Sequence, residues 1–173
     1  MLQDFIDEYR RYRKLGERAI AQMPDEALNH LPNADGNSTA MLVRHMSGNL
    51  VSRFTDFLTQ DGEKPWRARD DEFVAYQLTR NELDATWGTG WDVLEAQLAT
   101  LTDADMERVV TIRRQELTVH AALCRSLAHV SYHVGQIVLL ARSSAQDSWM
   151  SLSIPKNGTA AYNASPTMEK ASQ

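Results

Sequence analysis

Apolar residues recur every three to four positions over four separate stretches of the chain, which is the spacing of amphipathic helices. The first stretch covers residues 2–23. Its apolar positions are Phe5, Tyr9, Tyr12, Leu15, Ile20 and Met23. The second stretch runs to about Leu58, and Asn37, Ser38 and Thr39 offer N-cap side chains for its start.

Two further helices are predicted in the second half of the chain. Thr79 and Glu82 have the spacing of a capping box, and the helix that they begin extends to about Leu101. The fourth helix covers residues 120–143, with Thr118 as a candidate cap. Four helices of this length predict an all-α fold.

The connections differ in character. Residues 61–78 have no helical period, and this crossover is longer than antiparallel neighbours need, so the second and third helices can run parallel. Its alternating charges are expected to pair with one another.

β-branched residues around a polar turn predict a small hairpin over 109–119. Residues 149–163 lack a helical period but carry large apolar side chains, part of which should pack back on the helices. The polar end, 166–173, is expected to be disordered, which leaves residues 1–165 as a single domain.

Three histidines are the candidate functional residues. His129 and His133 lie four residues apart in the fourth helix, so their side chains project from one face. His45 heads a polar column with Asn49 and Arg53, at four-residue steps, beside the apolar stripe of the second helix. Because a metal site usually has at least three protein ligands, a two-histidine helix needs a third ligand from elsewhere. The column is therefore either a source of that ligand or a solvated helix edge.

Other individual residues have simpler interpretations. His30 and His120 are predicted to lie at the surface. Cys124 is the only cysteine, so it forms no internal disulfide, and its place on an apolar face predicts a small buried residue rather than a nucleophile. Gly48 costs about 1 kcal/mol relative to alanine within a helix, which predicts that a neighbouring helix approaches closely there.

Composition and charge exclude several classes of protein. The chain has 173 residues, enough for one domain with a sizeable core. Its net charge of -5, without long basic runs, predicts no basic surface of the kind that binds nucleic acid or an anionic membrane. The sequence has neither a secretory signal nor an apolar run near the ~20 residues that a transmembrane helix needs. We therefore expect a cytoplasmic protein.

Several segments resemble the DinB-like superfamily, and the likeness covers nearly the whole chain. The most specific segments are residues 45–50 (HMSGNL), 52–54 (SRF), 61–65 (DGEKP), 129–136 (HVSYHVGQ) and 152–156 (LSIPK). They point to a bacterial branch of unknown function within that superfamily.

The resemblance implies a four-helix bundle of up-down-down-up topology. It also implies that one histidine of the second helix and two of the fourth bind a divalent metal, commonly nickel or zinc, and the matching positions are His45, His129 and His133. We therefore predict metal–nitrogen bonds of about 2.0 to 2.2 Å at these residues. Protons compete for the same nitrogen lone pairs, so metal affinity should fall on acidification.

The resemblance further implies kinship with mycothiol-dependent maleylpyruvate isomerase and the bacillithiol S-transferases. Transfer of a low-molecular-weight thiol to a small electrophile is therefore the first functional hypothesis, with Asn49, Arg53 and Tyr132 as candidates for orienting a ligand. Metal-dependent hydrolysis is the second. A non-enzymatic metal- or ligand-binding module related to stress is the third, and hydrogen-bonded core-edge histidines without a physiological metal are the fourth. Whether the metal's open positions face a reachable pocket discriminates between catalysis and a stabilising metal.

The assembly state is predicted from outlying aromatic residues. Tyr12 and Trp87 add apolar surface that one core of four helices has difficulty accommodating, and exposed apolar surface usually marks a contact site. We therefore expect a homodimer. The alternative is that the crossover and the tail cover these side chains within one chain.

Overall fold

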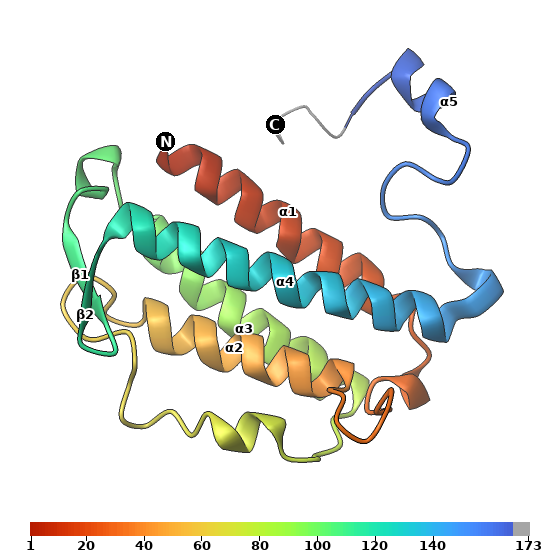
Figure 1. The fold of residues 1–173 in the computed structure, drawn as a ribbon, viewed down its shortest axis with the longest axis horizontal. Helices are drawn as coiled ribbons and strands as arrows, with labels where there is room; N and C mark the ends of the chain where they lie inside the picture. The colour runs from red at the N-terminus through yellow and green to blue at the C-terminus, as the bar shows by residue number, and fades with distance from the viewer. Residues whose placement is uncertain (168–173) are drawn as a thin grey trace.

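The computed structural model describes residues 1–167, which are mostly helical with one small two-stranded sheet. The four long helices are α1 (Leu2–Ile20), α2 (Thr39–Phe54), α3 (Arg80–Leu98) and α4 (Val119–Ala145). Helix α1 packs on α4 and α2 packs on α3. Helices α2 and α3 run in the same direction, opposite to α1 and α4 (Figure 1). The helices that the sequence predicts are therefore present, and the hairpin contributes Val110 and Ile112 to the core that they form.

The helix starts follow the predicted capping residues. The Ser38 hydroxyl accepts a hydrogen bond from the backbone amide of Met41, and the Thr118 hydroxyl accepts one from Ala121. Thr79 and Glu82 form the capping box, with both reciprocal bonds present. The helix ends come earlier than predicted for the first three helices. A tighter turn that does not continue the α-helical bonding follows α1 and α3, whereas α2 ends because Thr55 adopts an extended conformation.

The crossover between α2 and α3 runs back along the length of α2 (Figure 1). It contains a short 3-10 turn, η2 (Asp70–Phe73), which contacts α2. The predicted pairing of charges inside this segment is confirmed, since the guanidinium of Arg67 forms two hydrogen bonds of 2.8 Å with the Glu72 carboxylate. Hydrogen bonds from Arg44 of α2 to the backbone oxygens of Asp71 and Val74 fix the crossover against the helix that carries His45.

The predicted hairpin is also present, and it lies at the end of the helices near the start of α4 (Figure 1). Strands β1 (Val109–Ile112) and β2 (Gln115–Thr118) pair antiparallel, with Ile112 opposite Gln115. The two turn residues, Arg113 and Arg114, have positive φ angles of 53° and 62°. The Asp61 carboxylate accepts hydrogen bonds from both of their amides at 2.8 Å, which supports this turn without glycine.

Two glycines allow close approach of the long helices. A Cβ on Gly90 of α3 would lie 2.6 Å from the Cα of Ser47 on α2, and one on Gly16 of α1 would lie 2.5 Å from the Trp87 ring. Trp87 is consequently only 4% exposed. The prediction that Trp87 is an outlying aromatic residue was wrong, because the missing side chain of Gly16 makes room for its ring.

The C-terminal region departs in part from expectation. Trp149 and Leu152 pack against the core, as predicted for part of this tail. Helix α5 (Thr159–Ala164) forms where no helical period was recognised, and it carries no buried residue. Its six residues are too few to show a hydrophobic stripe. The predicted disordered end falls mostly on residues 168–173, which lie outside the described residues.

Candidate metal centre

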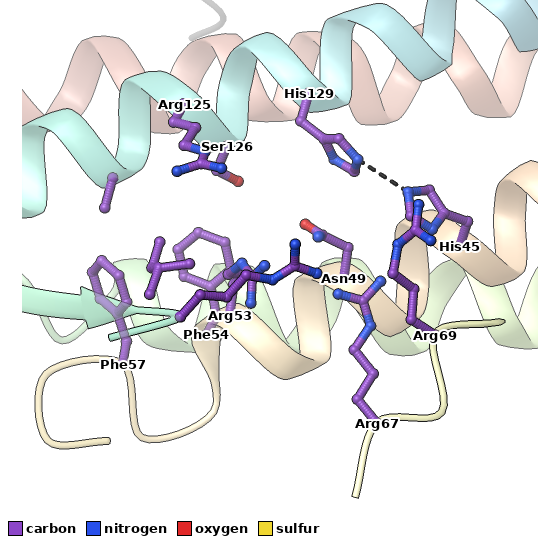
Figure 2. A pocket seen from close by; sticks show the side chains of 13 residues that line it. His45, Asn49, Arg53, Phe54, Phe57, Arg67, Arg69, Arg125, Ser126 and His129 are labelled. Atoms are coloured by element: carbon purple, nitrogen blue, oxygen red, sulfur yellow. Dashed lines mark hydrogen bonds between the residues drawn. The ribbon is translucent and has the colours of Figure 1, made fainter. Parts of the chain in front are cut away.

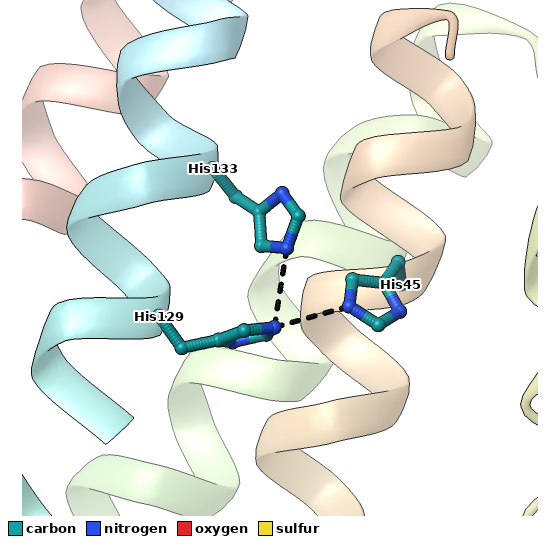
Figure 3. Close-up of side chains that lie close together, drawn as sticks. All are labelled: His45, His129 and His133. Carbon is teal, nitrogen blue, oxygen red and sulfur yellow. Dashed lines mark hydrogen bonds between the residues drawn. The ribbon is translucent and has the colours of Figure 1, made fainter. Parts of the chain in front are cut away.

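The structure brings the three predicted histidines together between α2 and α4 (Figure 3). The Nε2 atom of His129 lies 3.1 Å from Nε2 of His45 and 3.1 Å from Nε2 of His133. One ligand atom from each residue falls within 4.8 Å of the other two. His45 and His133 are buried and His129 is half-buried, so this cluster could hold one metal ion.

The opposite ring nitrogens decide which tautomers are present. Nδ1 of His45 lies 2.8 Å from a carboxylate oxygen of Glu72, and an ionised carboxylate only accepts hydrogen bonds. Nδ1 of His133 lies 2.7 Å from the amide oxygen Oε1 of Gln136, which is also an acceptor. Both Nδ1 atoms therefore carry the proton. The lone pairs on Nε2 of His45 and His133 are left to point into the cluster.

This arrangement fits a divalent metal. His129 Nε2 lies between two nitrogens with lone pairs, and a neutral imidazole has at most one proton to offer there. At least one close nitrogen pair is therefore unsatisfied without a cation. Metal–nitrogen bonds of about 2.0 to 2.1 Å place ligand nitrogens roughly 3 Å apart, which agrees with the 3.1 Å separations found here.

Glu72 holds His45 and was not predicted as a site residue. It is 8% exposed and is bound by both Arg67 and His45. Burial raises the pKa of this carboxyl group, but the hydrogen bonds from His45 and Arg67 outweigh that effect and lower the pKa below its usual value. A Cβ on Gly48 would overlap Oε1 of Glu72. The element that comes close to Gly48 is therefore the 3-10 turn η2, through the Glu72 side chain for which the glycine makes room.

Replacement of Glu72 by glutamine is expected to weaken metal binding by about tenfold to a hundredfold, the usual cost of losing an outer-shell partner. The glutamine keeps the volume but not the charge that orients and polarises His45. Competition titration with a chromophoric zinc chelator measures the change. Glu26→Gln is the matched control, because Glu26 is an exposed carboxylate away from the cluster. Equal affinities of the two variants would contradict the role assigned to Glu72.

His129 and His133 have depressed pKa values. Burial is the main cause for His129, and the neighbouring His133 and His45 add to it, which lowers the pKa of His129 to about 3. Burial also lowers the pKa of His133, against the opposing effect of its hydrogen bond to Gln136. The metal-free cluster therefore keeps His129 neutral, and thus able to bind a cation, well below neutral pH.

Acidification is expected to destabilise the metal-free protein. Unfolded histidines take up protons near their ordinary pKa of about 6.5, while folded His129 does so only near pH 3. The unfolded state thus binds more protons in this window. The free energy of unfolding holds its full value above about pH 6.5 and falls as the pH decreases toward 3. Urea denaturation at several pH values checks this, and His129→Gln should give a shallower dependence. Identical slopes would contradict it.

A cavity of about 180 Å³ opens beside the cluster (Figure 2). His45 and His129 form part of its lining, so the centre faces open space and is not sealed by side chains. The sequence candidates Asn49 and Arg53 also line it. Tyr132 does not line it. Its ring stacks edge-on against His133, and its side chain is 63% exposed on the outer side of α4.

The prediction that Cys124 is buried was wrong. Its side chain is exposed, because position 124 turns away from the stripe that α4 buries. In addition, His120 lies one helical turn before it, and the His120 Nε2 atom is 3.8 Å from the Cys124 sulfur. The predictions that His30 and His120 lie at the surface are confirmed.

Fold and cluster together define a mostly helical protein with a three-histidine site that could bind a metal ion. Residues 1–158 match the family described as "Protein of unknown function (DUF1572)", and the chain belongs to that family. No curated protein matches it. Among the described residues, no helix combines the length and the apolar character that crossing a membrane requires.

Proposed function

We propose that this chain is a divalent-metal protein of the DinB-like kind, whose four long helices form an up-down-down-up bundle around His45, His129 and His133. We further propose that the centre transfers a low-molecular-weight thiol of the bacillithiol or mycothiol type to a small electrophile. The observation that carries the proposal is that the three Nε2 atoms converge at the end of an open cavity.

Hydrogen bonds on the far side of two of the rings support metal binding. Glu72 and Gln136 accept from the Nδ1 atoms of His45 and His133, so both rings are fixed before a metal arrives. Zinc and nickel both suit imidazole ligands, so the donor set favours these metals. Once bound, such an ion acts as a Lewis acid and favours the deprotonated form of a thiol or water.

The residues around the cavity supply positioning. The Arg53 guanidinium is fixed by the Glu63 carboxylate at 3.0 Å and by the backbone oxygen of Gly62. Asn49 lies one turn before it on α2 and presents its amide to the same space (Figure 2). A ligand between α2 and α4 would therefore meet fixed donors beside the histidines, while Phe54 and Phe57 offer an apolar wall.

Metal analysis of the untagged protein, purified without added nickel, tests the first part of the proposal. We expect about one zinc or nickel ion per chain. The metal-loaded protein is then supplied with bacillithiol or mycothiol and 1-chloro-2,4-dinitrobenzene. In the expected reaction the carbon–chlorine bond breaks, a carbon–sulfur bond forms, and the thiol proton and chloride are released.

His129→Gln is the control for this assay, because it should lose both metal and activity. Hydrolysis of an electrophile without any thiol would assign a metal-dependent hydrolase activity to the protein in place of thiol transfer. Bound metal without turnover of any substrate would favour the non-enzymatic binding module instead. A chain that retains no metal would contradict the proposal as a whole.

We also propose a homodimer, and the exposed residues that support it differ from those that the sequence suggested. Trp87 is buried, but Tyr132 and Leu139 are 63% and 65% exposed and lie two turns apart on the outer side of α4. Light scattering over a dilution series tests this, with twice the 19.5 kDa chain mass expected. Leu139→Glu should return the mass to that of one chain. A single-chain mass for the unaltered protein throughout the series would exclude the dimer.

A further inference from the structure

The cavity beside the histidines has a strongly one-sided charge. Among the described residues, the charged side chains that line it are all arginines, namely Arg53, Arg67, Arg69, Arg113 and Arg125, with no aspartate or glutamate. The chain as a whole carries a net charge of -5. A concentration of guanidinium groups in one cavity of an acidic protein is therefore a local feature and does not follow from composition.

The arginines come from four separate parts of the fold. Arg53 projects from α2, Arg67 and Arg69 from the crossover, and Arg125 from α4, so that their side chains gather around the space between α2 and α4 (Figure 2). Arg113 joins them from the hairpin turn. No local sequence pattern links these segments.

Neighbouring carboxylates balance only part of this charge. Glu63 binds both Arg53 and Arg113, and Glu72 binds Arg67. Of the carboxylates within residues 1–167, Arg69 pairs only with that of Asp70, at 3.6 Å, and that side chain is 99% exposed and therefore strongly screened.

Arg125 is the arginine left without a partner. Within residues 1–167, no carboxylate lies within salt-bridge distance of its guanidinium. The space beside the histidines therefore favours an anion.

We propose that this cavity binds the acidic group, carboxylate or phosphate, of a small substrate, and that Arg125 is the residue whose guanidinium is free to pair with it. Arginine forms paired hydrogen bonds with either oxyanion. At about 180 Å³ the cavity is smaller than the roughly 300 to 1,000 Å³ of pockets for drug-sized ligands, which restricts the ligand to a compact molecule. The inference rests on the proposed function in one respect, since it places the acidic group of that substrate beside the three histidines.

Calorimetric titration of the metal-free protein with succinate and with inorganic phosphate, at low ionic strength, tests the proposal. We expect at least one of the two anions to bind, and Arg125→Gln to weaken that binding by about tenfold to a hundredfold. Arg142→Gln is the matched control, because Arg142 is an exposed arginine of the same helix that does not line the cavity. Arg125→Lys, which keeps the charge but not the planar fork, should fall between the two.

Each outcome has a definite meaning. Tighter binding of succinate assigns a carboxylate substrate, and tighter binding of phosphate assigns a phosphorylated one. Binding of neither anion, equal affinities of Arg125→Gln and the unaltered protein, or equal weakening by Arg142→Gln would overturn the proposal. Because the titration uses metal-free protein, His129→Gln should still bind the anion. Failure of the metal centre is thereby distinguished from failure of the anion site.

Discussion

Replacement of His129 by glutamine is expected to lower the affinity for zinc or nickel by more than about a hundredfold, which exceeds the usual cost of removing an outer-shell partner. His129 is the middle member of the cluster, with Nε2 at 3.1 Å from both other histidines. Its loss leaves two ligands from different helices, and two ligands rarely retain a divalent ion. Metal content after dialysis and competition titration measure the change.

The fold should survive this substitution. The His129 side chain is half-buried at the edge of the cavity, and glutamine fills similar space while keeping a polar end. Far-ultraviolet circular dichroism verifies that the helices remain. His30→Gln provides the control, since His30 is exposed and lies outside the cluster. If His129→Gln retained the affinity of His30→Gln, the three-histidine centre would be refuted.

Replacement of Gly90 by alanine is expected to lower the free energy of unfolding by about 1 to 3 kcal/mol, the usual cost of overpacking. The added Cβ would lie 2.6 Å from the Cα of Ser47, and neither backbone can move without separating α2 from α3. This penalty outweighs the gain of up to about 1 kcal/mol in helix propensity from replacing glycine. Urea denaturation followed by circular dichroism measures it.

Gly88 on the same helix provides an internal comparison for Gly90. A Cβ at that position meets no atom within 4 Å, so Gly88→Ala carries the propensity gain without the clash. We expect it to raise the free energy of unfolding by about 0.5 to 1 kcal/mol. The two substitutions should therefore have opposite signs. Stabilisation by both would show that α2 and α3 do not pack as closely as the structure has them.

Local sequence signals predicted the helical elements well. The capping residues Ser38, Thr79 and Thr118 act through bonds to amides three residues away, so their effect is readable from spacing alone. Helix α5 and the buried position of Trp87 escaped prediction for different reasons. The first is too short to show a period, and the second depends on Gly16, which lies 71 positions earlier in the chain.

The sequence could predict those residues of the candidate site that lie at helical spacing from one another. Four-residue spacing identified His129 and His133 as a pair and placed Asn49 and Arg53 behind His45, and the resemblance to a known superfamily joined His45 to the other two histidines. Gln136 and Arg125 were missed, although they stand three residues after His133 and four before His129. Glu72 could not be found this way, since 27 positions and a nonhelical crossover separate it from His45.

The hairpin turn has a consequence for attempts to stabilise this protein. Arg113 and Arg114 both adopt left-handed backbone angles, where asparagine and glycine are more favourable by about 1 kcal/mol or more per residue. A selection for thermal resistance would therefore favour Asn-Gly at these two positions. That change would remove the Arg113 side chain from the cavity and leave Glu63 with one guanidinium partner in place of two. A more heat-resistant turn would thus weaken the attraction of the cavity for anions.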